Sequence, residues 1–423
     1  MNPSFKSALP LIAAFAISAC SSGGGSASVP GATTSGGGTT PFAAVQQITA
    51  KPEWLVKGLA RPECPQVTGK PVCLALRGLN HGAVPAACNP SSTCGFTAQQ
   101  IEKAYGLKPK ELLGKGSGVQ VALIEAGDYS AATADVGTYR TQYGLPTANI
   151  IRYNQNGKTT GLPSSCQDFG WCVETALDFD MVSATCPKCT IDLMEADGSI
   201  AGFEAANQAA VKLGAKIISN SWICYGNWDC GDANFPNSFN SKGVTFLAAS
   251  GDEAYNEIGG PSVLSTVLAA GGTQLETQGK KFTETAWNDA GSGCETSVTK
   301  PSWQSDPGCT GRTDSDISAE AGCQPGVAMY SGLYNGWFYE CGTSVASPLL
   351  SGIVALAGNT ANLNGGNYVW ALPTAKKTKS IHTISSGSNG SCGGSYLCTA
   401  GTNQFGTYAG PSGWGSPKNV KAL

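Results

Sequence analysis

The stretch Val119-Gln-Val-Ala-Leu-Ile-Glu-Ala-Gly127 is an apolar run that ends in a carboxylate and a glycine. Because such a run is bounded by a turn signal, it predicts a buried strand. Further short apolar runs follow at Thr190–Met194, Lys216–Ser219, Val244–Ala249 and Val267–Ala270. Helical patterns lie between them, at Cys172–Ala184 and Ile200–Leu213. Strands that alternate with helices predict an α/β fold with a mostly parallel sheet and helices on both faces.

The first residues are typical of an export signal. Lys6 supplies a positive start, residues 8–19 are almost wholly apolar, and Ile17-Ser-Ala-Cys20 closes the segment. The apolar run is too short to span a bilayer as a helix. Small residues before a cysteine resemble a bacterial lipoprotein signal, with an ordinary secretory signal as the alternative. We therefore expect a signal peptide over 1–19 and an exported protein, tethered by lipid on Cys20 to the cell envelope or surface, or released.

Three regions are expected after the signal. Residues 20–41 are nearly all small or polar, which predicts a flexible tether. Residues 42–115 form a cysteine-containing N-terminal extension, with one expected helix at Thr97–Tyr105 that begins with a capping box between Thr97 and Gln100. Residues 116–423 form the main domain, whose length of about 300 residues is within the range of such folds.

The cysteines predict disulfides. Setting Cys20 aside, sixteen of the 17 cysteines remain, and many lie in close pairs. In an exported protein these predict local bridges: Cys64/Cys73, Cys88/Cys94, Cys166/Cys172, Cys186/Cys189, Cys224/Cys230 and Cys392/Cys398. The other four, Cys294, Cys309, Cys323 and Cys341, allow three pairings. A metal or redox role for Cys186/Cys189 is the alternative there, but no second such pair and no nearby histidine supports it.

The composition excludes some functions. Charged residues make up 13% of the chain, about half the usual ~25%. The net charge of −3 argues against nucleic acid as a partner, because binding would need a basic surface. The Gly-rich stretches lack the lysine of a phosphate-binding loop. We expect a weakly charged, loop-rich monomer.

The segment Gly342-Thr-Ser-Val-Ala-Ser-Pro348 places Ser344 just before an apolar helix, expected over Ser347–Ala357 with Pro348 in its first turn. The amides and dipole at a helix start favour alkoxide character and could bind an oxyanion. Ala346 excludes the Gly-x-Ser-x-Gly elbow. Ser344 is therefore a candidate nucleophile, and a plain helix cap is the alternative.

Glu174 and Asp178 are two carboxylates at i and i+4 on one helix face. This spacing is unfavourable unless one carboxyl is protonated or the pair has a purpose. Neighbouring carboxyls have pKa values that move apart, so Glu174 could accept the proton of Ser344 while Asp178 orients it. The alternative is a solvated acidic face, which we expect for Asp180.

Asp252 follows the expected strand Val244–Ala249, at a carboxyl end where ligands bind in open sheets. Glu125 and the segment Ser219–Trp222 lie at other such ends. A protonated Asp252 could donate to an oxyanion, whereas an ionised one would repel it, so the site should work best in acid. A simple turn residue is the alternative.

The chain has only two histidines, His81 and His382. Neither lies between Asp128, the first aspartate, and Ser344, so an Asp, His, Ser order cannot be assembled. A histidine triad in another order stays open, because triads are defined by geometry.

In combination, these residues resemble the sedolisins, the serine-carboxyl peptidases with the subtilisin fold. The resemblance covers about residues 116–417 and rests on five motifs: Glu174-x-x-x-Asp178, Ser250-Gly-Asp252, Ala269-Ala-Gly-Gly-Thr273, Gly342-Thr-Ser344-x-Ala-Ser-Pro348 and Gly413-Trp-Gly-Ser-Pro417. It implies a three-layer α/β fold and a serine-type endopeptidase that acts on polypeptides. It also implies Ser344 as nucleophile, Glu174 as base, Asp178 as orienting partner, Asp252 as oxyanion residue and Glu125 in support.

Two departures from the family qualify the resemblance. Sedolisins usually bind calcium near the C-terminus through two aspartates, and the matching positions here hold Thr383 and Ala409. Since calcium prefers several oxygen ligands including carboxylates, we expect no calcium, and the chemistry requires no cofactor. Sedolisins also commonly carry a long prosegment, for which the roughly 70 residues of the extension look too few.

The leading hypothesis is an exported, lipid-anchored serine-carboxyl endopeptidase that favours acid. One rival is a catalytically silent surface protein that keeps a peptidase fold for binding or adhesion. The other is a histidine-dependent serine hydrolase that uses His382. Cleavage preference and natural substrate stay open.

Overall fold

The computed structural model describes residues 51–67, 69–79, 88–91, 93–225 and 228–423. The expected signal peptide, the tether, Cys20 and His81 lie outside the described residues. Within the described part of the chain, no helix has both the length and the hydropathy needed to cross a bilayer. The described residues belong to one compact unit, which starts at Ala44.

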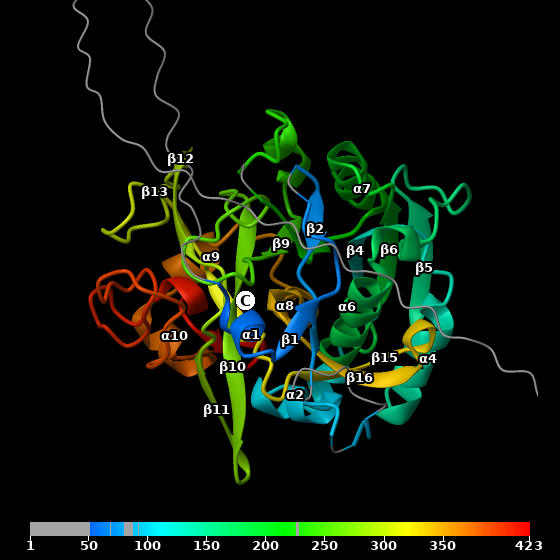
Figure 1. The fold of residues 1–423 in the computed structure, drawn as a ribbon, viewed down its shortest axis with the longest axis horizontal. Coiled ribbons are helices and arrows are strands. Elements are labelled where there is room, and N and C mark those ends of the chain that lie inside the picture. The colour runs from blue at the N-terminus through cyan, green and yellow to red at the C-terminus, as the bar shows by residue number, and fades with distance from the viewer. Residues whose placement is uncertain (1–50, 68, 80–87, 92, 226–227) are drawn as a thin grey trace, which may run out of the picture. The chain divides into compact units, whose positions relative to one another are not determined.

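An eight-stranded sheet forms the centre of this unit, in the order β11-β10-β9-β7-β4-β6-β5, with β14 also pairing with β10 (Figure 1). Its strands are β4 Gln120–Ala126, β5 Asn149–Asn154, β6 Thr190–Ala196, β7 Ile217–Asn220, β9 Thr245–Ala249, β10 Val267–Gln278, β11 Lys281–Ala286 and β14 Ile317–Glu320. All neighbours pair in parallel except β10 and β11. The five predicted strands are confirmed, and the mostly parallel α/β sheet with them.

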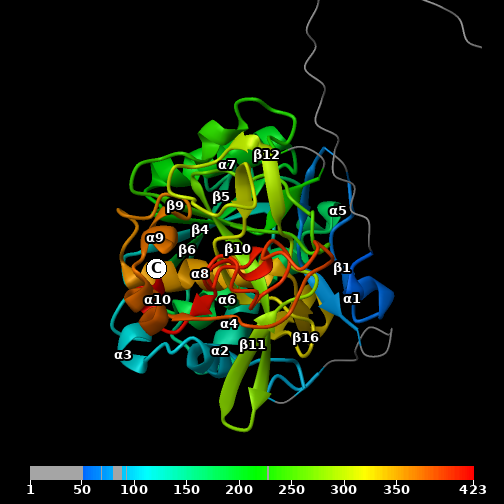
Figure 2. The same cartoon turned by 90° about the vertical axis from the view of Figure 1, so that its left-hand side faces the viewer.

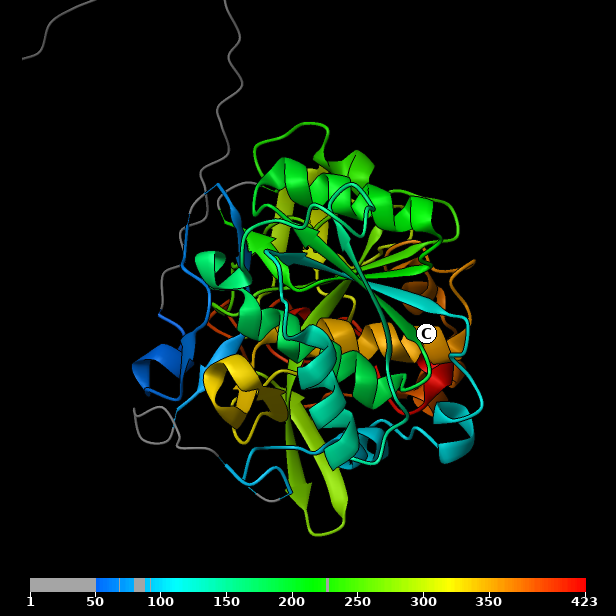
Figure 3. The same cartoon turned by 90° about the vertical axis from the view of Figure 1, so that its right-hand side faces the viewer.

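Helices cover both faces of the sheet. Figure 3 shows α6 (Cys172–Thr185) and α8 (Thr343–Ala357) side by side on one face, and α7 (Ile200–Leu213) on the other. The bounds of α7 agree with the prediction. The Ser199 side chain accepts the Gly202 N–H at its start, and Gly214 ends it at φ 102°, a left-handed conformation that suits glycine.

Helix α6 is buried along its whole length, because α8, α4 (Ala132–Gln142) and β15 (Val327–Ser331) all pack against it. The expectation of a solvated face for Asp180 was therefore wrong. Asp180 is 1% exposed, and its Oδ2 accepts the Tyr330 N–H at 2.9 Å. Its role is to satisfy a strand amide within the core.

Helix α8 begins four residues earlier than predicted, so Ser344 lies inside its first turn. Pro348 consequently stands in the helix interior, where its missing N–H leaves the Ser344 carbonyl without the usual i+4 donor. The prediction that Pro348 marks the first turn was wrong. Apolar residues that fill the rest of α8 keep the helix in the core despite the proline.

The remaining elements surround this core. The other helices are α1 Glu53–Val56, α2 Ala98–Ala104, α3 Pro109–Leu112, α5 Cys166–Phe169, α9 Asn367–Ala371 and α10 Thr374–Ser380, with short 3₁₀ turns at Phe235–Phe239, Gly332–Tyr334, Gly410–Ser412 and Val420–Ala422. The other strands are β1 Ala60–Pro62, β2 Pro71–Cys73, β3 Leu76–Gly78, β8 Trp222–Cys224, β12 Gly293–Thr299, β13 Gly311–Asp314, β16 Gly336–Cys341, β17 Ile381–His382 and β18 Ser416–Pro417. Figure 2 shows the C-terminal segments, orange to red, lying across β10.

The predicted capping box at α2 is confirmed, with Thr97 accepting from the Gln100 N–H and Gln100 accepting from the Thr97 N–H. All six predicted local disulfides are present. The four remaining cysteines pair as Cys294–Cys309 and Cys323–Cys341. Since Cys186 and Cys189 bridge each other, no free thiol is left there for a metal.

Candidate active site

Ser344 lies against the carboxyl group of Glu174. Its Oγ donates to Glu174 Oε2 at 2.9 Å and is also 3.2 Å from the Ser221 carbonyl oxygen. Both side chains are fully buried. The contact exists because α8 and α6 pack side by side under the sheet and each presents its first turn to the other. A hydroxyl in this position can give its proton to the carboxylate.

Gly342 makes the sharp entry into α8 possible. It adopts φ 103° and ψ 162°, a region that residues with a Cβ essentially avoid. A Cβ there would also stand 2.2 Å from the Leu74 carbonyl oxygen and 2.5 Å from Asp252 Oδ2. A glycine is therefore required beside the nucleophile, both for its conformation and for space.

Three carboxyl groups form a chain behind the serine. Asp178 lies one turn after Glu174 on α6 and is also a close neighbour of Glu125. Burial raises the pKa of Glu174 well above its usual range, and the neighbouring Asp178 raises it further. Burial likewise raises the pKa values of Glu125 and Asp178. These three carboxyl groups therefore keep protons, and share them with one another, at pH values where exposed carboxyl groups are ionised.

Ser221, which follows strand β7, holds this group of three carboxyls in place. Its Oγ donates to both Asp178 oxygens, at 2.8 and 3.0 Å, which fixes the orientation of that carboxyl. Its carbonyl oxygen lies beside the Ser344 hydroxyl. The sequence places the segment Ser219–Trp222 at a strand end, but nothing in it marks Ser221 as the partner of Asp178.

Asp252 contacts Thr343, the residue before Ser344 at the start of α8. Its Oδ1 accepts the Thr343 N–H at 2.7 Å and the Thr343 hydroxyl at 2.8 Å. Its Oδ2 is buried and has no hydrogen-bond partner among the described residues. Burial raises the pKa of Asp252 well above its usual range, by more than the two bonds from Thr343 lower it. A protonated Oδ2 is therefore available as a donor beside Gly342.

His382 does not take part in this group. It lies on β17, where burial and then the nearby Lys418 lower its pKa. No hydrogen bond joins it to Ser344 in the described structure. The structure thus brings Ser344, Glu174, Asp178 and Asp252 together and leaves His382 apart.

The two positions where the family would hold calcium do not fit a cation. Ala409 is fully buried in an apolar cluster with Ala286, Ile384 and Ala400, and Thr383 supplies no carboxylate. Nowhere among the described residues do three or more His, Cys, Asp or Glu side chains group in a way that could hold a metal ion. The expectation that calcium is not bound stays a prediction.

Comparison with known proteins places the chain in a family. The subtilase family model matches residues 125–402, which include all four candidate residues. Among solved structures, Pseudomonas sedolisin, a serine-carboxyl proteinase complexed with two molecules of pseudo-iodotyrostatin, is 26% identical with a TM-score of 0.65, over 78% of this chain and 97% of that one. A lanthipeptide protease is 14% identical with a TM-score of 0.48, over 76% and 92%. No curated protein matches.

The family match covers well over half of the chain, and the sedolisin likeness spans nearly all of that enzyme. The predicted subtilisin-like α/β fold is confirmed. The chain belongs to the subtilase family of serine peptidases.

Proposed function

We propose that the protein is a serine-carboxyl endopeptidase that hydrolyses polypeptides through an acyl-enzyme on Ser344. The observation that carries this is the 2.9 Å hydrogen bond from Ser344 Oγ to Glu174 Oε2, in a place where other families need a histidine. The likeness to a serine-carboxyl proteinase supports the same assignment.

In acylation, Glu174 takes the Ser344 proton as Oγ attacks the scissile carbonyl carbon. Asp178, held by Ser221, orients the Glu174 carboxyl and shares the proton that Glu174 gains. The negative oxygen of the tetrahedral intermediate forms beside Asp252 Oδ2, which donates its proton in a hydrogen bond, and the dipole of α8 adds to the stabilisation. Glu174 then protonates the leaving amine.

Deacylation repeats these roles with water. Glu174 removes a proton from the water that attacks the acyl carbon, and the proton returns to Ser344 Oγ as the acid product leaves. The site needs one proton missing from the group Glu174, Asp178 and Glu125, so that Glu174 can accept the serine proton, together with a protonated Asp252. Since an ionised Asp252 would repel the oxyanion, activity should fall as the pH rises and Asp252 loses its proton, so we expect a preference for acid.

The decisive experiment measures hydrolysis of an unfolded protein from pH 3 to 8. Wild type should be active in acid, and both Ser344→Ala and Glu174→Gln should be inactive. Asp180→Asn is the matched control, because Asp180 lies buried on the same helix but contacts β15 rather than the serine. Activity that survives in Glu174→Gln would remove the glutamate as base.

A silent binding protein is the remaining alternative, and a fluorophosphonate active-serine probe separates the two. Labelling of Ser344 at acid pH supports the enzyme, whereas a folded wild type that is neither labelled nor active supports the binding protein. We further propose export with lipid on Cys20, which mass spectrometry of the mature N-terminus would test. The chain should be a monomer, as sedimentation would show.

A further inference from the structure

A segment of the N-terminal extension has the backbone contacts of a peptide bound at the candidate active site. Strand β2 pairs antiparallel with β8, and the Leu74 N–H donates to the Ser221 carbonyl at 3.2 Å. The Ala75 N–H donates to Glu174 Oε2 at 2.8 Å, the same oxygen that accepts from Ser344. The segment therefore marks the path of a bound polypeptide, and its residues after Leu74 show which surfaces that polypeptide meets beyond the cleaved bond.

Beyond Ala75 the segment continues as strand β3, which pairs antiparallel with β16. In this pair Arg77 stands opposite Glu340. Side chains that stand directly opposite in an antiparallel pair share one face and lie close together. Because β16 ends three residues before Ser344, a polypeptide that is held at the serine and adds to β16 in the same way places its third residue after the bond opposite Glu340.

The Arg77 side chain is enclosed although it carries a charge. Only 5% of the residue is exposed. Its guanidinium lies over two aromatic rings, with the central carbon 4.4 Å from the ring centre of Phe338 and 4.8 Å from that of Tyr334. Arg77 Nε is also 2.5 Å from Glu63 Oε1 and 3.6 Å from Glu340 Oε1. Two rings and two carboxyl groups therefore surround the cation, a combination that attracts a guanidinium.

Three of these four partners belong to the peptidase domain. Phe338 and Glu340 lie on β16, and Tyr334 lies in the 3₁₀ turn just before it. Glu63 instead directly follows β1, which pairs with β3 and so belongs to the extension, like Arg77 itself. When another polypeptide takes the place of the segment, Glu63 leaves together with Arg77. Two rings and one carboxyl group then stay behind as a pocket for the incoming side chain.

Glu340 is a buried acid that needs a partner. It is fully buried, and neither of its carboxyl oxygens has a hydrogen-bond partner among the described residues. Burial raises the pKa of Glu340 well above its usual range and Glu63 raises it further, whereas the positive charges of Arg77 and Arg61 lower it. A guanidinium at this place therefore stabilises the ionised carboxylate. Arg61 lies on β1 and leaves with the extension, so the substrate has to supply the cation.

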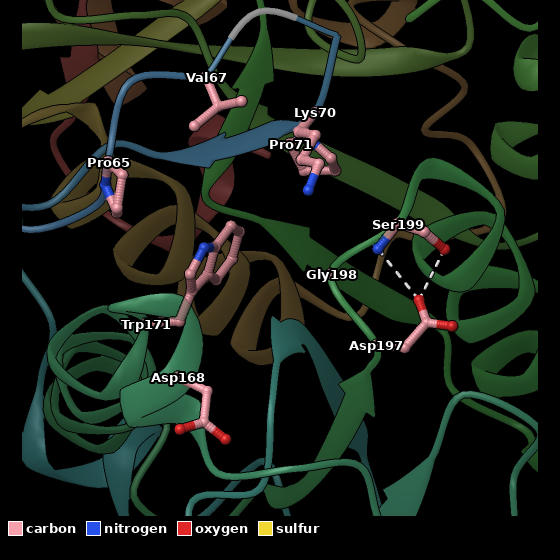
Figure 4. Close-up of a pocket in the computed structure, with 9 residues that line it drawn as sticks. All are labelled: Pro65, Val67, Lys70, Pro71, Asp168, Trp171, Asp197, Gly198 and Ser199. Carbon is pink, nitrogen blue, oxygen red and sulfur yellow. Dashed lines mark hydrogen bonds between the residues drawn. The ribbon is translucent and has the colours of Figure 1, made fainter.

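The nearest cation on the other side of the bond is held differently. A pocket of about 260 Å³ opens there, with Lys70 and Pro71 in one wall and Trp171 and Ser199 in another (Figure 4). Lys70 is exposed, so water solvates its ammonium group, and a pairing with any carboxylate there contributes little. The enclosed site for a positive charge therefore lies after the cleaved bond.

We propose that Glu340, Phe338 and Tyr334 form a specificity site for arginine at the third position after the cleaved bond of a polypeptide substrate. The proposal rests on the proposed function, because it describes one side of the same active site. The arginine stacks on the two rings and pairs with Glu340. A planar guanidinium covers aromatic rings better than an ammonium group does, so arginine is preferred over lysine. A glutamate at this position would meet Glu340 and is rejected.

The test measures kcat/KM of the full-length chain at acid pH for peptides that differ only in the third residue after the cleaved bond. We expect the arginine peptide to exceed the glutamine peptide by at least about tenfold, with lysine between them and glutamate lowest. The control peptide has the same composition, with the arginine moved to the fourth position. It keeps the net charge but loses the register with Glu340, so it should be no better than the glutamine peptide.

A variant assigns the preference to the pocket. In Glu340→Gln, the ratio of kcat/KM between the arginine and glutamine peptides should fall at least about fivefold, because the charged partner is lost. A ratio within one variant is insensitive to a partial loss of folded protein. Glu195→Gln is the matched control, since Glu195 is also a buried glutamate beside an arginine, but its partner Arg152 lies on β5. This control should keep the wild-type ratio.

Other outcomes would overturn the inference. Equal rates for the arginine and glutamine peptides, or an equal gain from arginine at the third and fourth positions, would show that the site does not select the third residue. The proposed function would then stand, because the peptides are cut. A ratio that stays unchanged in Glu340→Gln would also overturn the inference. A folded wild type that cuts no peptide of the set and no unfolded protein overturns both proposals.

Discussion

The backbone N–H of Ala75 donates to Oε2 of Glu174, at 2.8 Å. A single carboxyl oxygen therefore faces both the hydroxyl that must lose a proton and a peptide nitrogen that could receive one. General acid and base catalysis by one group requires this arrangement, because the proton has to travel from nucleophile to leaving group.

Removing the base should nearly abolish turnover. We expect kcat/KM for an unfolded substrate at acid pH to fall about 10²–10⁴-fold in Glu174→Gln, the usual contribution of a general base. Asp180→Asn, on the same helix, should stay within a few-fold of wild type. Equal losses in the two variants would indicate damage to α6 rather than loss of a base. Circular dichroism on both variants controls for folding.

The pH profile should depend on Asp252. Burial raises the pKa of Asp252, so the carboxyl stays protonated in acid and ionises as the pH rises through this raised value. Asp252→Asn offers an N–H donor that cannot ionise. We expect this variant to be less active at the optimum, with its decline on the alkaline side shifted to higher pH or removed. An unchanged alkaline limb would assign that limb to another group. Initial rates from pH 3 to 8 provide the measurement.

Stability should decrease as the pH rises. Burial raises the pKa of Asp180 well above its usual range, so the native state holds a proton that the unfolded chain releases. This contribution is complete below the ordinary aspartate pKa and is lost as the pH rises through the raised native value. We expect a lower Tm at pH 7.5 than at pH 4 in the Ser344→Ala background, which prevents self-digestion.

Adding Asp180→Asn to that background should reduce the difference in Tm, because an amide cannot ionise and can still accept the Tyr330 N–H. Glu276→Gln, at an exposed position, is the control and should change nothing. A Tm that rises from pH 4 to 7.5 would contradict the prediction.

Substrates with leucine before the cleaved bond should be preferred. The Leu74 carbonyl oxygen and Asp252 Oδ2 both flank Gly342, beside the nucleophile. The Leu74 side chain is buried against Ile223, Ala249 and Tyr225, and burying a charge there would cost far more than burying leucine. In a peptide series that varies only this residue, we expect kcat/KM to be at least about 100-fold higher for leucine than for glutamate or lysine. Equal rates across the series would show that this pocket does not select substrates.

Calcium should not stabilise the protein. A ligand that binds only the native state raises the Tm, and millimolar calcium would reveal even a weak site. We expect no change in Tm on adding calcium or a chelator, because Ala409 and Ile384 pack together where a ligand set would have to stand. A stoichiometric calcium ion measured in the folded protein would refute this.

The sequence was most informative where the periodic pattern and the local chemistry agreed. The bounds of α7 agree with the predicted ones, since Ser199 and Gly214 mark its ends, and the capping box at Thr97 identified α2. The spacing of Glu174 and Asp178 made them candidates, and the structure brings Glu174 to Ser344, while their roles stay a prediction. The edge strand β11 was not predicted, because its polar residues lack the apolar run that marks a buried strand.

The sequence alone did not predict the contacts between segments that are distant along the chain. Asp180 seemed solvated because its burial depends on three elements that pack around α6. The start of α8 was misplaced because Pro348 looks like a first-turn residue, yet packing tolerates it in the interior. No local pattern marks Ala75, whose N–H donates to a carboxylate 99 residues away.

The arrangement of the disulfides has a consequence for how the protein withstands attack by other proteases. Within the described part of the chain, no bridge joins residues more than 18 positions apart, so each one closes a small loop and leaves the longer connections between elements unlinked. If another protease cut the backbone inside one of these loops, the two pieces would stay joined through sulfur. A cut elsewhere in the described residues would leave two pieces held together by packing alone.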